Sequence, residues 1–477
     1  MRHGTYVRGT SKLLWLTLAL ALAVPSAAAA GGVGTWTRVT DKGAWFELNL
    51  LRHDGRLHIG VREDETATST YHMIHRSISS DGVVGPPHAI APGYGYLGYY
   101  PAFVSVGSQL RMNFGAGYEG DGYSNSHMEV VVSNDNGDTW TAPFDTKVTD
   151  GPAESPTEMD GTLGPDGIGY YVWEGTLCIC VQRYTGLEDT DHTNFNDTGG
   201  NNYDPSIGFD SATGRMWVVY LVTGIDNPGL YQREVNTADG EPIGDSTFLG
   251  GSSSSFQGAQ FISSQNGHVP MAERSQGGVF VAYHTGYPTL NRVRVWRIGG
   301  VIKTIARMKG IGEVAIAADP NGRLWGVWTR NGRIYARRSN ESVTNWGKTV
   351  TMRYPKDTVG VTTIQADAQA KVVDVLAHSQ QVGNSGFFHT QMEPGISFRA
   401  RPKRFPKDER TEVTFRTKDA GDPLPNSRVK VAGESCTTNA QGVCSIKLGP
   451  YERRRRLKAT AEHADYKTAK RKLRVTR

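Results

Sequence analysis

The chain has 477 residues, of which 57 are glycine and 21% are charged, and this composition suits many short strands joined by turns. The length exceeds one ordinary domain, and the only long apolar run lies near the N-terminus, so the composition argues against a membrane-embedded body. The overall charge of +5 is unevenly distributed along the chain, because residues 396–477 carry a net charge of +13 and the preceding residues carry −8.

The N-terminus has the pattern of a secretory signal. Basic residues that include Arg2 and Lys12 precede an apolar run over 13–24, and small residues follow at 26–30. We therefore predict a signal peptide over 1–30 and a secreted, extracellular protein. No cysteine follows the run to carry a lipid, and no hydrophobic tail ends the chain, so only noncovalent contacts would hold it at a cell wall.

A unit made of a strand, a tight turn and a second strand recurs along residues 31–396. Its copies are 47–61, 102–114, 157–173, 205–221, 270–283, 314–328 and 362–376. Their spacing of about 50 residues is the size of a four-stranded propeller blade. The repeats predict an all-β chain with a closed β-propeller of seven blades, or six if 362–376, the weakest unit, is dropped.

Residues 133–140 read S-N-D-N-G-D-T-W and fit the pattern S-x-D-x-G-x-T-W. Ser133 and Asp135 can bond the loop backbone, Gly137 can supply a positive φ, and Thr139 and Trp140 return on the next strand. This motif resembles the Asp-box of the sialidase-like (BNR) β-propeller family. The resemblance implies a structural role for these residues and a propeller fold.

A second copy of the end of this motif lies at the mature N-terminus. Gly34-Thr35-Trp36-Thr37 matches the sequence at 137–141 but has no blade of its own. We predict that it forms the fourth strand of the last blade, next to 387–391, and so removes both free sheet edges.

Polar residues and prolines over 397–410 predict a linker, and 411–477 predict a small basic β-sandwich that resembles bacterial immunoglobulin-like or transthyretin-like modules. Cys436 and Cys444 lie symmetrically about a hairpin turn, and we expect a disulfide between them in a secreted protein. Cys178 and Cys180 lie on one face of a strand, where we expect core residues; a strained local disulfide is the alternative.

Basic runs at 453–456 and 470–472 account for much of the charge of this module. They indicate either a solvated face or attraction to an anionic cell-surface polymer. No aromatic residues interleave with them, so we do not expect nucleic acid as a partner.

Catalytic candidates lie in the loops that leave second strands and enter first strands, which gather on the face opposite the Asp-box. Carboxylates, tyrosines, histidines and arginines that converge on one opening are suited to glycan processing. The candidates are Arg62, Asp64, Glu158, Glu174, Tyr203, Asp204, His284 and Arg330. We expect no cofactor or catalytic metal, although carboxylates near Glu119 and Asp121 could hold a structural calcium ion.

Comparison with the sialidase-like family weakens a sialidase assignment. Sialidases carry an Arg-Ile-Pro motif in the opening strand, and its arginine binds the sialate carboxylate; the corresponding stretch here is Phe46-Glu47-Leu48-Asn49. Glu47 would repel a sialate.

Three functions remain open for a monomer that acts on glycans. We expect an exo-acting glycoside hydrolase of sialidase type on an acidic glycan. The alternatives are a non-catalytic binding propeller and a propeller-type polysaccharide lyase, in which Tyr203 or His284 would be the base and Arg62 or Arg330 would neutralise a uronate.

Overall fold

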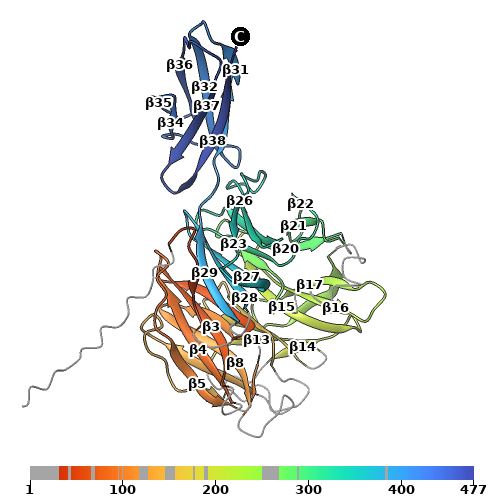
Figure 1. Ribbon diagram of the computed structural model, residues 1–477. Helices are drawn as coiled ribbons and strands as arrows, with labels where there is room; N and C mark the ends of the chain where they lie inside the picture. Colours follow the sequence, from red (N-terminus) through yellow and green to blue (C-terminus); the bar gives the residue numbers. More distant parts are fainter. Residues whose placement is uncertain are drawn as a thin grey trace, which may run out of the picture.

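The computed structural model describes residues 32–40, 44–65, 70–94, 96–98, 100–117, 127–145, 156–175, 178–186, 192–249, 268–286, 289–381 and 385–477. Within these ranges the chain is all-β and has no helix, so no described helix could cross a membrane. The strands form seven successive antiparallel sheets and a small two-sheet sandwich that stands off one side of them (Figure 1). The predicted signal peptide over 1–30 lies outside the described residues.

The seven sheets follow one another along the chain, and each contains a strand, a hairpin partner and further strands outward. The strands are β2 (Ala44–His53), β3 (Arg56–Glu65), β4 (Thr70–Ile78) and β5 (His88–Tyr94) in the first sheet; β6 (Tyr96–Leu97), β7 (Ala102–Val106), β8 (Gln109–Gly117), β9 (His127–Ser133) and β10 (Phe144–Asp145) in the second; β11 (Met159–Leu163), β12 (Gly169–Glu174), β13 (Ile179–Tyr184) and β14 (Thr193–Phe195) in the third; β15 (Asn201–Asp210), β16 (Arg215–Thr223), β17 (Gly229–Val235) and β18 (Pro242–Phe248) in the fourth; β19 (Met271–Glu273), β20 (Val279–Thr285), β21 (Arg292–Arg297) and β22 (Ile302–Arg307) in the fifth; β23 (Val314–Ala318), β24 (Leu324–Arg330), β25 (Arg333–Arg338) and β26 (Val350–Arg353) in the sixth; and β27 (Thr358–Ala368), β28 (Val373–Gln381), β29 (Gly386–Met392) and β1 (Thr37–Arg38) in the seventh.

The inner strands, which are β2, β7, β11, β15, β19, β23 and β27, contact one another in this order, and β27 contacts β2. The second strands are buried on both faces because they lie between neighbouring sheets, and their sequences are correspondingly rich in Val, Tyr and Trp. Trp173, Trp325 and Trp328 are fully buried in the apolar clusters between successive sheets. Burial of these aromatic side chains holds adjacent sheets face to face.

The N-terminal segment supplies the outer strand of the seventh sheet. Thr37 lies opposite His389 and Arg38 opposite Phe388, which confirms the predicted pairing next to 387–391. The indole Nε1 of Trp36 donates to the Arg353 carbonyl at 2.8 Å, so this strand also contacts the sixth sheet.

The Asp-box residues form the turn between β9 and β10. Ser133 Oγ accepts the Gly137 N–H at 2.8 Å, and Asp135 Oδ1 accepts the Thr139 N–H at 2.8 Å. Hydrogen bonds from Thr139 lower the pKa of Asp135 to about 2. Gly137 has a φ of 83°, and a Cβ there would lie 2.8 Å from the His75 ring, against which Trp140 also packs. These bonds give the five motif residues a structural role in the turn.

The C-terminal sandwich begins earlier than the sequence analysis placed it. One sheet contains β30 (Ser397–Arg401), β32 (Thr411–Asp419), β33 (Asp422–Pro423) and β36 (Val443–Leu448), and the other contains β31 (Arg404–Pro406), β34 (Arg428–Val431), β35 (Glu434–Thr437), β37 (Arg456–His463) and β38 (Tyr466–Thr476). The expected linker over 397–410 is therefore wrong, because 397–401 and 404–406 are strands. Phe398, Ala400 and Phe405 alternate into the core among charged neighbours, which concealed the pattern.

The four cysteines differ in their bonding. Cys436 and Cys444 form a disulfide that joins β35 to β36. These strands belong to different sheets, so the bond links the two layers and not, as we assumed, two paired strands of one hairpin. Cys178 and Cys180 are not joined by a disulfide, although their Sγ atoms lie 3.0 Å apart, and Cys180 is fully buried.

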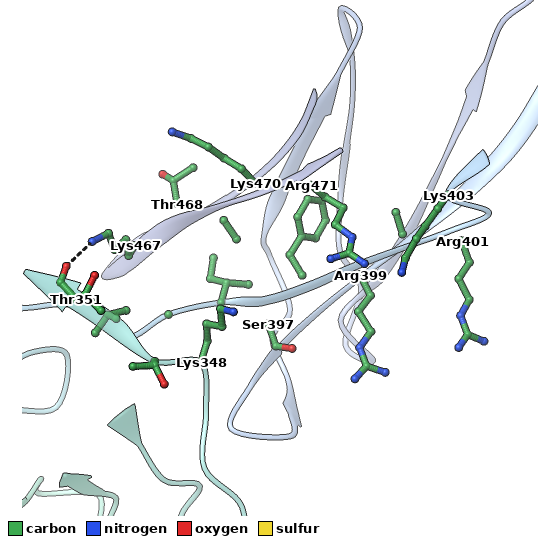
Figure 2. Close-up of a pocket in the computed structure, with 17 residues that line it drawn as sticks. Lys348, Thr351, Ser397, Arg399, Arg401, Lys403, Lys467, Thr468, Lys470 and Arg471 are labelled. Carbon is green, nitrogen blue, oxygen red and sulfur yellow. Dashed lines mark hydrogen bonds between the residues drawn. The ribbon is translucent and has the colours of Figure 1, made fainter. Parts of the chain in front are cut away.

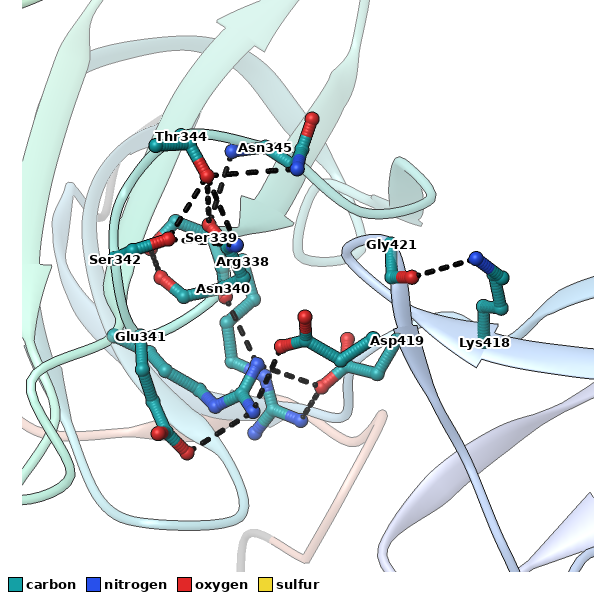
Figure 3. Close-up of polar contacts among 12 residues, drawn as sticks. Arg338, Ser339, Asn340, Glu341, Ser342, Thr344, Asn345, Lys418, Asp419 and Gly421 are labelled. Atoms are coloured by element: carbon teal, nitrogen blue, oxygen red, sulfur yellow. Dashed lines mark hydrogen bonds and ion pairs between the residues drawn. The ribbon is translucent and has the colours of Figure 1, made fainter. Parts of the chain in front are cut away.

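A degenerate copy of the Asp-box at 339–346 lies beside the sandwich (Figure 3). Its turn is held by Asn340, whose Oδ1 accepts the Asn345 N–H at 2.9 Å, while Glu341 pairs with Arg323 at 3.3 Å. When 339–346 is aligned with 133–140, Glu341 stands at the position of Asp135. The side chain that bonds this loop, Asn340, therefore lies one residue earlier than the motif predicts.

Candidate active site

A small hollow lies where the inner strands converge. It has a volume of about 120 Å³, and the first, third, fifth, sixth and seventh sheets contribute to its lining. Its polar lining residues are Asn49, Asp160, His268 and Gln365. The amides of Asn49 and Gln365 bond the carbonyls of Met159 and Leu48 at 3.4 and 2.6 Å. A volume of this size holds a few water molecules.

Three of the predicted candidates come together beside this hollow. Glu158 directly precedes β11, Glu174 ends β12, and Asp204 lies in β15. The start of one antiparallel strand and the end of its hairpin partner share one end of a sheet, so the third sheet brings both glutamates together. Asp204, from the next sheet, donates its backbone N–H to Glu158 Oε2 at 3.0 Å and to Glu174 Oε2 at 3.4 Å.

The backbone of Asp204 is shaped for this contact. It has a φ of 54°, and the register of β15 against β16 shifts between Tyr203 and Ser206. A residue in this left-handed region leaves the sheet ladder, and aspartate tolerates it better than most residues. The bulge therefore turns the N–H toward the two glutamates. We call Glu158 and Glu174 the glutamate pair, and we use the name mouth for this pair together with Asp204 and His268; of these four residues, His268 lines the hollow.

The glutamate pair holds a proton at neutral pH. Burial raises the pKa of Glu158 well above its ordinary value, and the negative charge of Glu174 raises it further. Burial also raises the pKa of Glu174 to about 8, with a further contribution from Asp204. The two side chains are hydrogen-bonded to each other, so the protonation of each carboxyl group depends on the other.

His268 adds a neutral imidazole to the mouth. Its ring meets Tyr100 edge to face, with centroids 6.4 Å apart. Burial lowers the pKa of His268, and the nearby charge of Asp160 opposes this shift. A neutral histidine can accept a proton at physiological pH.

The other predicted candidates lie apart from this cluster. Tyr203 is next to Asp204 in sequence but is 37% exposed. His284 is buried, and its Nδ1 donates to the Gly312 carbonyl at 3.0 Å. Arg330 Nε donates to the Lys309 carbonyl at 2.6 Å, so both side chains support the segment that enters β23.

Arg62 and Asp64 lie at the end of β3. Arg62 is buried, donates to the Leu97 carbonyl at 3.0 Å and stacks 4.6 Å over the ring of Tyr71. Asp64 lies opposite Tyr71 in the β3–β4 pairing, and its side chain, like that of Glu47, lies outside the described residues.

The sequence analysis missed Asp160, His268 and Glu313. Glu313 directly precedes β23 as Glu158 precedes β11, and burial raises its pKa well above the ordinary value. Alignment of the repeat units with one another could have found Glu313. Glu158-Met159 and Glu313-Val314 both stand at the start of an inner strand. His268 and Tyr100 also precede inner strands, β19 and β7, but they are different residue types and so do not stand out when the repeats are aligned.

No group of three or more described Asp, Glu, His or Cys side chains is arranged to hold a metal ion. The calcium site expected near Glu119 and Asp121 falls outside the described residues.

No protein family model matches the chain, and no curated protein matches it significantly. Several solved structures are similar at low identity. An ulvan lyase of polysaccharide lyase family PL25 is 12% identical over 76% of this chain and 95% of its own, with a TM-score of 0.45. A GH32 β-fructofuranosidase from Bombyx mori is 10% identical over 75% and 91%, with a TM-score of 0.38. A Trypanosoma rangeli sialidase is 10% identical over 75% and 57%, with a TM-score of 0.37. These values are too low to support a functional inference.

Proposed function

We propose that the chain is a secreted carbohydrate-active protein built on a closed, seven-bladed β-propeller, and that it is a glycoside hydrolase. The cyclic contacts of the inner strands and the pairing of β1 with β29 support the closed ring. The proton held by the glutamate pair at the mouth carries the enzymatic proposal.

The glutamate pair acts as the general acid. Cleavage of a glycosidic bond requires a proton on the leaving oxygen, and a carboxyl group with a raised pKa can deliver it near neutral pH. The Asp204 N–H bonds both glutamates and would stabilise the carboxylate that remains after transfer. The pair is hydrogen-bonded internally, so its members are too close together to flank the bond as acid and nucleophile.

Asp160 is the candidate general base. It lies two residues after Glu158 on the same side of the strand, which is a rise of about 6.6–6.8 Å along the backbone and brings the two carboxyl groups to a separation of the same order. Inverting glycosidases separate their two carboxyl groups by about 6.5–9.5 Å to leave room for water. Asp160 lines the 120 Å³ hollow, where a water molecule could sit between base and sugar. We therefore propose inverting chemistry.

The charge of the mouth restricts the substrate. Arg62 and Arg330 are bonded to backbone carbonyls, and the mouth residues include three carboxyl groups. An acidic glycan would therefore have to place its charge away from the bond that is cleaved.

Glu174→Gln and Asp160→Asn test these roles in the mature protein, with release of reducing ends from a polysaccharide panel as the assay. We expect each variant to lose about 100-fold or more of the activity. The wild-type rate should decline as the pH rises through about 8, where the glutamate pair loses its proton. Glu241→Gln, at an exposed site, is the matched control. Full activity in Glu174→Gln would exclude the pair as the acid.

A lyase is the second candidate, because neutral His268 and Tyr100 lie side by side at the mouth. There His268 would abstract the C5 proton of a uronate whose carboxylate is hydrogen-bonded by the protonated glutamate pair. The C4–O bond would then break, and Tyr100 would donate a proton to the leaving oxygen. The product would carry an unsaturated uronate. A binding propeller would release no product.

A further inference from the structure

A strongly basic cleft lies where the sixth sheet meets the C-terminal sandwich (Figure 2). It has a volume of about 660 Å³ and is lined by segments within 348–351, 395–403 and 467–471. Its cationic residues are Lys348, Arg399, Arg401, Lys403, Lys467, Lys470 and Arg471. None of the described residues that line it is acidic. We call these seven side chains and the space between them the basic cleft.

The alternation of β30 explains how its arginines reach the cleft. Phe398 and Ala400 are buried in the sandwich core, so Arg399 and Arg401 point outward with exposed side chains. Across the cleft, Arg471 lies on β38 two residues before the buried Leu473, so both side chains are on the same side of the strand. The side chain of Arg471 is half-buried. Two strands from different layers therefore direct positive charge into one opening.

These charges are not neutralised within the described protein. None of the seven forms an ion pair with a described residue, whereas nearby Arg338 is paired with Asp419. Lys467 Nζ donates to the Thr351 carbonyl at 3.3 Å and interacts electrostatically with Glu393, which does not line the cleft.

Sheet stability does not explain this charge pattern. Arg399 of the basic cleft lies directly opposite Arg416 in the pairing of β30 with β32. Like charges directly opposite one another destabilise an antiparallel pair. Arg399 and Arg401 also line a second cavity of about 560 Å³ with Arg416 and Lys418. An anionic ligand lying across β30 would offset the repulsion between Arg399 and Arg416.

We propose that the basic cleft binds a linear acidic polysaccharide. β30 pairs only with β32 among the described strands, so its other edge offers backbone groups to sugar hydroxyls beside the arginine forks that bind carboxylate or sulfate. Nucleic acid fits less well, because the only aromatic lining residue, Phe398, is buried in the core and offers no face to a base. The binding is independent of any chemistry at the mouth.

Affinity electrophoresis of the full mature chain in gels containing polygalacturonate or dextran sulfate tests the proposal. Arg399→Ser/Arg401→Ser/Lys470→Ser removes three exposed charges from the cleft. Arg453→Ser/Arg456→Ser/Lys447→Ser is the matched control, with the same composition and charge change at exposed positions outside the lining. We expect the cleft variant to bind at least about 10-fold more weakly and the control less than about 3-fold more weakly. Thermal unfolding of both variants checks that they are folded.

Two results would overturn the proposal. Equal weakening in the cleft and control variants would assign binding to the general charge of the module. Single-stranded DNA that binds at least as tightly as both polysaccharides at equal ionic strength would assign the cleft to nucleic acid. If only dextran sulfate is retained, the ligand class narrows to sulfated chains; if only polygalacturonate is retained, it narrows to uronates.

Discussion

Arg338 and Asp419 form a buried ion pair between the sixth sheet and the C-terminal sandwich, with the Arg338 Nη2 2.5 Å from the Asp419 Oδ2 (Figure 3). Their side chains are 5% and 4% exposed. The same carboxylate oxygen accepts the Tyr466 hydroxyl at 3.0 Å and lies 3.3 Å from Arg323. The Asp419 carboxylate therefore contacts two arginines, Arg338 of β25 and Arg323 directly before β24, and orients Tyr466 of β38.

Replacement of Asp419 should loosen this junction. Asp419→Asn keeps the volume but leaves the buried Arg338 without its counter-charge, and the loss of one partner from a buried pair costs about 3–5 kcal/mol. We expect a lower unfolding temperature and faster proteolytic cleavage between the two parts. Lys371→Ala, which removes an exposed ion pair with Asp465, should cost at most about 1 kcal/mol. Equal effects of the two variants would show that the buried pair does not hold the junction.

Removal of the N-terminal strand should destabilise the seventh sheet. A chain that starts at Ala44 lacks β1, the Trp36 contact with Arg353 and the buried Val39, and it exposes the edge of β29. We expect a loss of about 3 kcal/mol or more, or aggregation. Thermal unfolding and light scattering measure this, with a chain that starts at Gly32 as the control. Identical melting of the two chains would place the closure elsewhere.

Acid should destabilise the first sheet through two stacked histidines. Burial lowers the pKa of His58 to about 4 and that of His75 to about 3, and their ring nitrogens lie 3.0 Å apart. The unfolded chain binds protons near pH 6.5 and the folded chain does not, so the free energy of unfolding should fall as the pH drops from about 6.5 to 4.

His75→Gln should flatten this dependence, measured by urea unfolding at pH 7, 5.5 and 4.5. His463→Gln, at a site on the sandwich surface, should leave it unchanged. A wild-type slope in the His75 variant would mean that other groups cause the acid sensitivity.

A fluorogenic sialoside should not be hydrolysed by the mature protein. Glu47 replaces the expected arginine, and the described Arg62 and Arg330 are bonded to backbone carbonyls. An unpaired like charge would cost several kcal/mol of binding. Release of the fluorophore that Arg330→Ala abolishes would instead show that Arg330 supplies the cation.

Local patterns predicted the sheets well. All seven repeat units coincide with a first and second strand, including 362–376, which forms β27 and β28. The sequence match between the segments around Trp36 and Trp140 allowed us to predict the pairing of β1 with β29. The start of the sandwich was missed because its inward residues alternate with arginine and lysine.

The candidate site was only partly predictable, because its members meet through topology. Glu158, Glu174 and Asp204 are 16 and 30 residues apart and share one N–H only because β15 bulges. The eight catalytic candidates predicted from the sequence also included Arg62 and Arg330. Both bond backbone carbonyls, and no sequence pattern indicates those bonds. His268 follows a long polar stretch and carries no motif.

Product analysis tests the central claim most directly. The mature protein and its Glu174→Gln variant would be incubated with a panel of neutral and acidic polysaccharides, and reducing ends and ultraviolet absorbance would be followed together. We predict new reducing ends without unsaturated uronate, and a loss of about 100-fold or more in the variant. Absorbance that rises with the reducing ends would contradict the hydrolase and favour a lyase, and the absence of any product despite retained binding would identify a binding propeller.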